Sequence, residues 1–221
     1  MSSSTMALIA VLCVLSALTA TGYSFSCQLC VASDQTTCSG VNILCPTNYV
    51  CGTKLSNMTI SGTSTLTVNR LCSPPDQCNK SGSVTIPGGT VLVGMSCCYT
   101  SECNPPMPIL SSMTDNSTNG ITCRSCLTVN SNECYNSNTI RCTGSETKCL
   151  LQNTKITGTQ PVTVAMRGCA TEDICSFGSQ SFNSSSFTST YNYICTSRSI
   201  RTYSLVSAPT LVLFLLVKFV L

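Results

Sequence analysis

The segment CQLCVASDQTTC, residues 27–38, begins a ladder of cysteines that occurs twice in this chain. Residues 123–134, CRSCLTVNSNEC, repeat its spacing of two and then seven intervening residues. From there the gaps continue as 6, 5, 20, 5, 18, 0 and 4 in the first copy and as 7, 6, 19, 5 and 19 in the second. No matched gap differs by more than one residue, so the chain is a tandem repeat of about 96 residues. The first copy contains Cys27, Cys30, Cys38, Cys45, Cys51, Cys72, Cys78, Cys97, Cys98 and Cys103, and the second contains Cys123, Cys126, Cys134, Cys142, Cys149, Cys169, Cys175 and Cys195.

The amino-terminal segment predicts export. Residues 6–18 (MALIAVLCVLSAL) form an apolar run of signal-peptide length, and small residues follow it. We therefore expect residues 1–22 to be a signal peptide. Its removal takes away Cys13 and leaves 18 cysteines, an even number that can pair completely. The sequence has no histidine, and an oxidising compartment favours disulfides over thiolate ligands, so we expect no metal and no cofactor.

The composition is typical of small domains that depend on disulfides. Charged residues make up 9% of the chain, and tryptophan is absent. Domains of this size bury little apolar surface, and each disulfide typically adds about 2–4 kcal/mol by restricting the unfolded chain. Residues 23–197 contain eight Lys or Arg and eight Asp or Glu, so this stretch is neutral. It has no basic footprint for nucleic acid, and we expect no nucleic-acid partner.

The carboxyl-terminal segment predicts a lipid anchor. Residues 205–221 (LVSAPTLVLFLLVKFVL) are apolar apart from Lys218 and are shorter than a typical membrane-spanning helix. A small residue, a polar spacer and an apolar tail form the signal for a glycosylphosphatidylinositol (GPI) anchor. We predict attachment at Ser197 and removal of residues 198–221, which places the protein on the extracellular face of the plasma membrane. A short tail anchor and simple secretion are the alternatives.

The stretch between the repeats reads as a linker. Residues 105–122 have prolines at 105, 106 and 108 and continue with Ser, Thr and Asn, a composition typical of flexible connectors. We therefore expect the relative orientation of the two domains to be undefined. The exported chain also has four sequons for N-glycosylation, at Asn57, Asn79, Asn116 and Asn183.

Within each repeat the pattern predicts strands and turns. Residues 54–60 and 63–69 flank a Ser-Gly pair, and residues 83–86 and 90–95 flank Pro-Gly-Gly, which is typical of hairpins. Residues 150–156 with 161–166, and 181–187 with 190–194, occupy the same places in the second repeat. Together with a turn between the second and third cysteines, each repeat is expected to contain three hairpins. The predicted fold class is all-β and disulfide-rich.

The ladder that opens with Cys27-Gln28-Leu29-Cys30 and closes with Cys97-Cys98, four residues and Cys103-Asn104 resembles the lymphocyte antigen 6/urokinase receptor (LU) family. The resemblance implies two tandem three-finger domains like those of snake toxins, at residues 23–104, closed by Asn104, and 123–197. The tandem layout is similar to gamma-type phospholipase inhibitors and to two-domain relatives of the urokinase receptor. The resemblance also implies nine disulfides: Cys27–Cys51, Cys30–Cys38, Cys45–Cys72, Cys78–Cys97, Cys98–Cys103, Cys123–Cys149, Cys126–Cys134, Cys142–Cys169 and Cys175–Cys195.

The second repeat departs from the family pattern at its end. Thr196 stands where the first repeat has Cys98, and no closing Cys-Asn pair follows. Both partners of one disulfide are absent together, so no thiol is left over. The edge of the second domain is therefore expected to be less restrained than that of the first, and to lie close to the membrane.

The residues favour binding over catalysis. Without histidine there is no Ser-His or Cys-His pair, and the acids are scattered apart from Glu172-Asp173, so we expect no enzyme. We predict a GPI-anchored receptor, adhesion or signalling module that presents its fingers to an extracellular or cell-surface protein. An inhibitor of secreted phospholipase and a modulator of a receptor channel or of complement are the alternatives. The aromatic contact candidates are Tyr49, Phe182, Phe187, Tyr191 and Tyr193.

Overall fold

The computed structural model describes residues 24–111, 115–158, 161–183 and 188–197. The predicted signal peptide and the predicted anchor segment 198–221 lie outside the described residues. Strands make up most of the described chain, and its helical segments are the short 3-10 helix η1 (Pro75–Gln77) and the short α-helix α2 (Glu172–Cys175). The predicted all-β, disulfide-rich class is confirmed.

The first domain consists of three antiparallel hairpins. They are β1 (Ser26–Ser33) with β2 (Val41–Leu44), β3 (Val50–Ile60) with β4 (Thr63–Ser73), and β5 (Ser81–Ile86) with β6 (Gly89–Cys98). The turn after β3 contains Gly62 at φ +84°, and the turn after β5 contains Gly88 at φ +72°. L side chains rarely adopt these angles, which explains why glycine occupies both turns.

The second domain repeats this plan with a divided first finger. Here β7 (Thr118–Arg124) pairs with β9 (Thr139–Thr143), while β8 (Cys126–Val129) pairs with β11 (Val162–Ala170). The other two fingers are β10 (Lys148–Thr157) with β11 (Val162–Ala170), and β12 (Ser179–Asn183) with β13 (Thr188–Thr196). The predicted hairpins therefore lie within these strand pairs, apart from residues outside the described part of the chain.

Nine disulfides join the strands near their roots, and the pairs are the nine that the family resemblance implies. Five lie in the first domain and four in the second. Two clusters of three cysteines, around Cys27 and around Cys123, bring sulfur atoms within 4.8 Å of one another. All six cysteines in these clusters belong to disulfides, which leaves no thiolate there to bind a metal.

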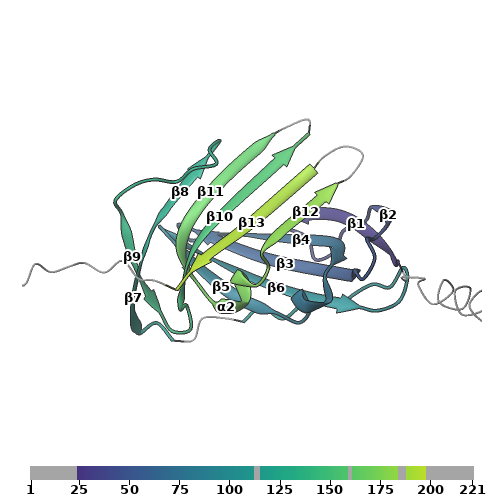
Figure 1. The fold of residues 1–221 in the computed structure, drawn as a ribbon, viewed down its shortest axis with the longest axis horizontal. Coiled ribbons are helices and arrows are strands. Elements are labelled where there is room, and N and C mark those ends of the chain that lie inside the picture. Colours follow the sequence, from purple (N-terminus) through teal and green to yellow (C-terminus); the bar gives the residue numbers. More distant parts are fainter. Residues whose placement is uncertain (1–23, 112–114, 159–160, 184–187, 198–221) are drawn as a thin grey trace, which may run out of the picture.

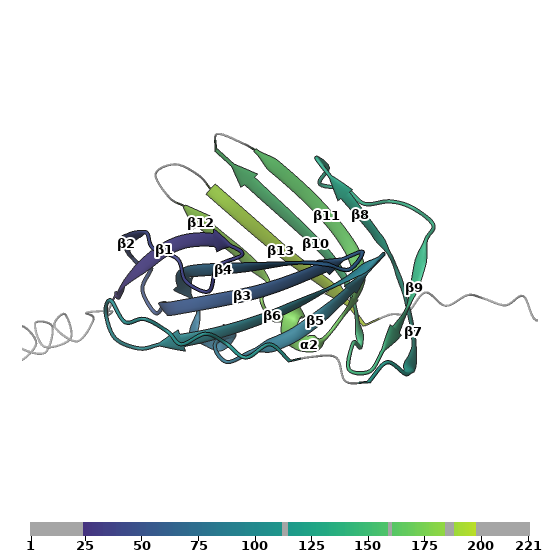
Figure 2. The same cartoon turned by 180° about the vertical axis from the view of Figure 1, so that it is seen from behind.

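The two domains share one sheet. Strand β11 of the second domain pairs with β5 of the first through Cys169 with Thr85 and Ala170 with Val84. This pairing gives the strand order β12-β13-β10-β11-β5-β6-β3-β4-β1-β2. Figures 1 and 2 show the green and yellow strands of the second domain lying across the purple and teal strands of the first. The long sheet is thus bent, and its two halves face each other.

A single apolar core fills the space between the two halves. It combines Leu71, Val84 and Met95 of the first domain with Leu150, Met166 and other side chains of the second. The expectation that the linker leaves the domain orientation undefined is therefore wrong. The strand pairing and the shared core fix the orientation, because separating the domains would expose this apolar surface to water.

Candidate functional site

The contact between the domains is built around a buried lysine. Lys54 lies on β3, and only 3% of its surface is exposed. Its Nζ donates hydrogen bonds to Gln180 Oε1 at 2.9 Å and to Tyr193 Oη at 2.8 Å, both in the second domain. These bonds matter because a buried ammonium group without partners is strongly unfavourable.

Aromatic rings of the second domain surround the same ammonium group. Its Nζ lies 5.2 Å from the ring centre of Phe177, 4.9 Å from that of Tyr191 and 5.0 Å from that of Tyr193. Such rings attract a cation through their negative faces. Burial nevertheless dominates and lowers the pKa of Lys54 to about 8, while the charge on Tyr191 acts in the opposite direction.

A buried glutamate forms the second polar contact between the domains. Glu146, in the loop before β10, has no exposed surface. Its Oε1 accepts hydrogen bonds from Ser83 Oγ at 2.9 Å and from Thr85 Oγ1 at 3.0 Å, both on β5. Burial raises the pKa of Glu146, and the hydrogen bonds from the two hydroxyls oppose that shift.

Glutamine side chains complete the polar network. Gln77 donates to the carbonyl oxygen of Phe177 at 2.9 Å and accepts from Gln180 Nε2 at 2.6 Å. Gln180 therefore links Gln77 and Lys54 of the first domain to one position on β12. Satisfied buried networks of this kind specify one arrangement of the parts that they join.

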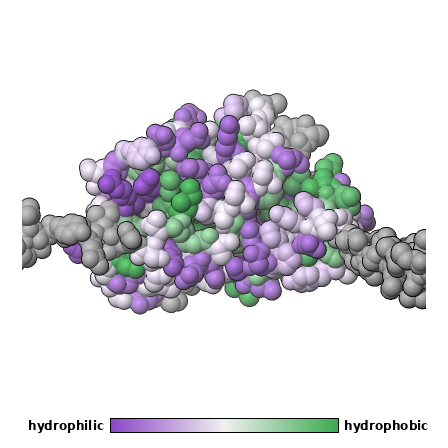
Figure 3. All heavy atoms as spheres, viewed as in Figure 1, coloured by the Kyte–Doolittle hydropathy of each residue, from purple (hydrophilic) through white to green (hydrophobic). Residues whose placement is uncertain are grey.

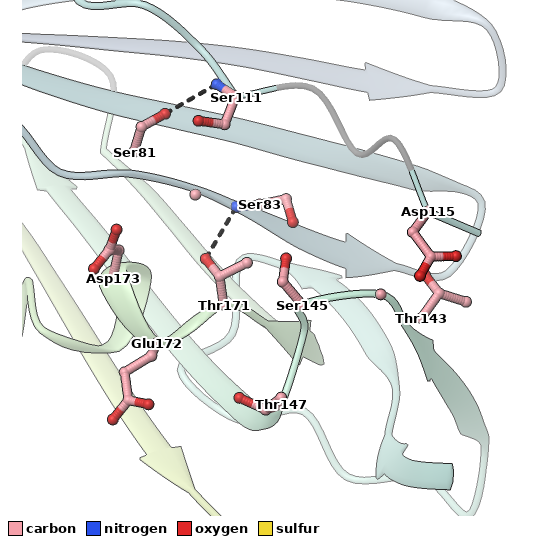
Figure 4. Close-up of a pocket in the computed structure, with 12 residues that line it drawn as sticks. Ser81, Ser83, Ser111, Asp115, Thr143, Ser145, Thr147, Thr171, Glu172 and Asp173 are labelled. Carbon is pink, nitrogen blue, oxygen red and sulfur yellow. Dashed lines mark hydrogen bonds between the residues drawn. The ribbon is translucent and has the colours of Figure 1, made fainter. Parts of the chain in front are cut away.

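A cleft of about 680 Å³ opens where the two domains meet beside β5 and α2 (Figure 4). Two hydrogen bonds cross its lining, from the Ser83 backbone N–H to Thr171 Oγ1 at 3.2 Å and from the Ser111 backbone N–H to Ser81 Oγ at 3.0 Å. Hydroxyl groups dominate the wall, together with carboxylates of Glu172 and Asp173. The cleft therefore offers hydrogen bonds to a polar group.

The aromatic contact candidates have different positions. Tyr193 is 7% exposed and lies in the core between the domains, so its prediction as a surface contact is corrected. Tyr191 and Phe182 are half-buried and pack against the same core, with their ring centres 5.8 Å apart. Tyr49 is half-buried against the cluster of Cys27, Cys45 and Cys51, and Phe187 lies outside the described residues. These rings mostly join the two domains to each other.

The predicted modification sites are mostly accessible. Asn79, Asn116 and Asn183 are exposed, whereas Asn57 is half-buried on β3 and its Oδ1 is buried without a hydrogen-bond partner. Ser197 is exposed at the end of the described chain, where its Oγ accepts a hydrogen bond from Lys148 Nζ at 3.1 Å. Asn104 is exposed beside the last disulfide of the first domain.

Sequence reasoning did not identify Lys54 or Glu146. Both are charged residues in a chain with few charges, and each reads as part of a solvated surface when only one repeat is considered. Their burial depends on the other domain, which the pattern of a single strand or loop does not reveal. The sequence feature that could have indicated a buried Lys54 is its position inside a predicted strand that has no other charged residue.

The sequence matches establish the family. A profile of the u-PAR/Ly-6 domain matches residues 23–106 and again residues 119–200, and the chain belongs to this family. Phospholipase A2 inhibitor NAI of Notechis ater is 29% identical over 77% of this chain and 86% of its own length. A phospholipase A2 inhibitor gamma subunit from Gloydius brevicaudus siniticus is 28% identical over 74% of this chain and 82% of its own length.

The solved structures include a more distant similarity. The crystal structure of mouse TEX101 is 17% identical, matches 78% of this chain and 99% of that chain, and gives a TM-score of 0.32. The family is an extracellular one, and its members are binding or inhibitor proteins. Among the described residues, no helix has the length and apolar character needed to cross a membrane.

Proposed function

We propose that this protein is a GPI-anchored cell-surface binding protein that presents its paired three-finger domains to an extracellular protein ligand. The observation that carries the proposal is the fixed double domain. Lys54, Glu146 and the shared core hold two loop-bearing modules in one orientation, so residues of both can contribute to one binding surface. Loops on a rigid scaffold are the usual carriers of recognition in such folds.

Membrane attachment is supported by the sequence at the carboxyl end. Ser197 is exposed just after β13, and an apolar segment of the kind that precedes lipid attachment follows it. Attachment there would place the second domain next to the membrane. The first domain is farther from the attachment site in the sequence.

Phospholipase cleavage tests the anchor directly. Cells that express the full chain would be treated with phosphatidylinositol-specific phospholipase C, and the protein would be followed with an antibody to residues 23–197. We expect release into the medium. A chain that ends at Ser197 is the control, and it should be secreted without treatment. Retention on cells that release a known GPI-anchored protein would contradict the proposal.

Inhibition of a secreted phospholipase A2 is the second candidate function. It is favoured by relatives that carry this name and are matched along 82% or more of their own length. Purified protein comprising residues 23–197 would be titrated into a phospholipase A2 assay with vesicle substrate. Saturable inhibition would support this candidate, and unchanged hydrolysis at a large excess of the protein would exclude it for the enzyme tested.

A further inference from the structure

The outer face of the first domain is covered by the chain that leaves it. We define the closing segment as residues 104–111, which follow the Cys98–Cys103 disulfide. Its Pro105 and Pro106 carbonyl oxygens accept hydrogen bonds from Thr53 on β3 and Ser96 on β6. Those two side chains are 1% and 6% exposed. Leu110 packs on the apolar cluster of the same face, so an extended, proline-rich segment shields this part of the sheet from water.

Among the residues that the structure describes, none covers the equivalent face of the second domain in this way. Leu151 pairs with Ile194 on β10 and β13, as Thr53 pairs with Ser96 on β3 and β6. Each pair stands two residues from the matched cysteines Cys149 and Cys51. The second repeat lacks the closing disulfide, and Ile194 is 53% exposed.

We define the uncovered face as Arg124, Leu151, Arg167, Ile194 and Thr196. These residues line a groove of about 290 Å³ together with Cys149 and Leu150. Figure 3 views the molecule from this side and shows an apolar patch over the strands of the second domain, with polar side chains around it. An aliphatic centre with an arginine-rich border is typical of the well-bound part of a protein interface.

The two faces differ in charge. Arg70 and Arg167 occupy matched positions, because Arg70 pairs with Thr53 and Arg167 pairs with Leu151. In the first domain, Arg70 donates a hydrogen bond to Gln28 and shares a small cavity with Glu102. In the second domain, Arg124 stands at the position that matches Gln28, and no residue matches Glu102.

The arginines of the uncovered face have no carboxylate partner within the described chain. The one ion pair found among the described residues joins Lys148 and Glu172 at 3.3 Å. Arg167 stacks on Tyr135 at 5.3 Å, and its Nε is buried without a hydrogen-bond partner. Guanidinium groups prefer carboxylates, which they bind through paired hydrogen bonds.

We propose that the uncovered face binds an extended acidic and apolar segment of a partner protein, placed as the closing segment is placed on the first domain. An aliphatic or proline side chain would cover Leu151 and Ile194, and a carboxylate would reach Arg124 and Arg167. The chain's own carboxyl-terminal segment fits poorly, because its first charged residues are Arg198 and Arg201. This inference rests on the proposed binding function and names one binding surface for it.

The test uses a peptide that contains residues 104–110 of the closing segment and the two residues before it, which include Glu102. The probe is the sequence of residues 102–110 with serine at the cysteine position, labelled with a fluorophore and titrated with protein comprising residues 23–197. We expect weak but saturable binding. Arg124→Glu and Ile194→Thr should each weaken it by about tenfold, since one changes an exposed arginine at the border of the contact and the other an exposed aliphatic side chain at its centre. The control Val41→Thr changes a similarly exposed aliphatic residue on β2 and should leave the affinity unchanged.

Three outcomes would overturn the proposal. They are the absence of saturable binding, binding that neither face variant weakens, and equal binding of a peptide in which the glutamate is replaced by lysine. A parallel titration with phosphatidylserine vesicles distinguishes a membrane-binding role. If the native protein binds the vesicles but not the peptide, and Arg124→Glu loses vesicle binding, the face binds lipid. The protein used carries no anchor, so a failed anchor experiment would leave this result unaffected.

Discussion

Replacing Lys54 with methionine tests whether the two domains enclose this side chain. A methionine side chain is apolar and has about the same length as that of lysine, so it should fill the same space among Phe177, Tyr191 and Tyr193. The substitution removes a buried ammonium group but leaves Gln180 Oε1 without that donor. The informative quantity is therefore the pH dependence of the stability difference between the two proteins.

The size of the effect follows from the pKa of Lys54. Burial lowers it from 10.5 to about 8, and each unit corresponds to about 1.4 kcal/mol, so keeping Lys54 charged in the folded protein costs about 3 kcal/mol. Between these two pKa values the unfolded chain binds more protons than the folded one. The stability of the native protein should therefore rise through this range, by about 2 kcal/mol between about pH 7 and about pH 9.5. Burial also raises the pKa values of Tyr191 and Tyr193 above 10.0, so both hydroxyls stay mostly protonated in the folded protein at pH 9.5.

Guanidinium unfolding followed by tyrosine fluorescence would measure this difference at several pH values. We expect the curve of Lys54→Met to lack the rise that the native protein shows. The control Lys155→Met replaces an exposed lysine on β10 and should keep the native pH dependence. If Lys54→Met and the native protein respond to pH in parallel, Lys54 is solvated and the domains do not enclose it.

Three further perturbations test the framework and the contact between the domains. Gly168→Ala would place a methyl group 1.9 Å from the Thr85 carbonyl oxygen, so we expect a loss of about 2 kcal/mol or more in unfolding experiments; an unchanged midpoint would contradict the β5–β11 pairing. Burial raises the pKa of Glu146 above 4.5, so the native protein should lose stability as pH rises through the range just above that value, whereas Glu146→Gln should not. Melting temperatures that change with pH to the same extent in both proteins would refute this. Replacing both Cys142 and Cys169 with alanine opens a loop with a sequence separation of 27 and should cost about 3 kcal/mol, which a retained denaturation midpoint would rule out.

The fold of each domain was predictable because the cysteine spacing constrains it covalently. The gap of 20 residues between Cys51 and Cys72 leaves room for one long hairpin, and β3 and β4 fill it. The Ser-Gly and Pro-Gly-Gly turns were predictable for a local reason, since Gly62 and Gly88 adopt positive φ. These features depend on short stretches of chain and on disulfides. The spacing and the family resemblance identify the cysteines that form those disulfides.

The contact between the domains was not predictable in the same way. Proline and serine in the linker indicated independent domains, yet the strands on either side carry the decisive apolar residues. Val84 and Met95 face Leu150 and Met166 in one core, and nothing in the linker encodes that contact. The buried position of Tyr193 has the same origin, because a tyrosine two residues before a cysteine on an edge hairpin is equally compatible with an exposed surface.

The shared core also determines which dissections of this protein are meaningful. Activity retained by one isolated domain would favour a toxin-like modulator of a channel or of complement. That experiment presupposes that each domain keeps its fold alone, whereas separation would expose Leu71 and Met95 on one side and Phe177 on the other, each 2% exposed or less in the intact molecule. It would also leave the Glu146 carboxylate without its hydroxyl donors. Loss of activity after dissection would thus report unfolding as readily as a need for both domains, and substitutions on exposed residues of the whole double domain are the sound way to locate its ligand.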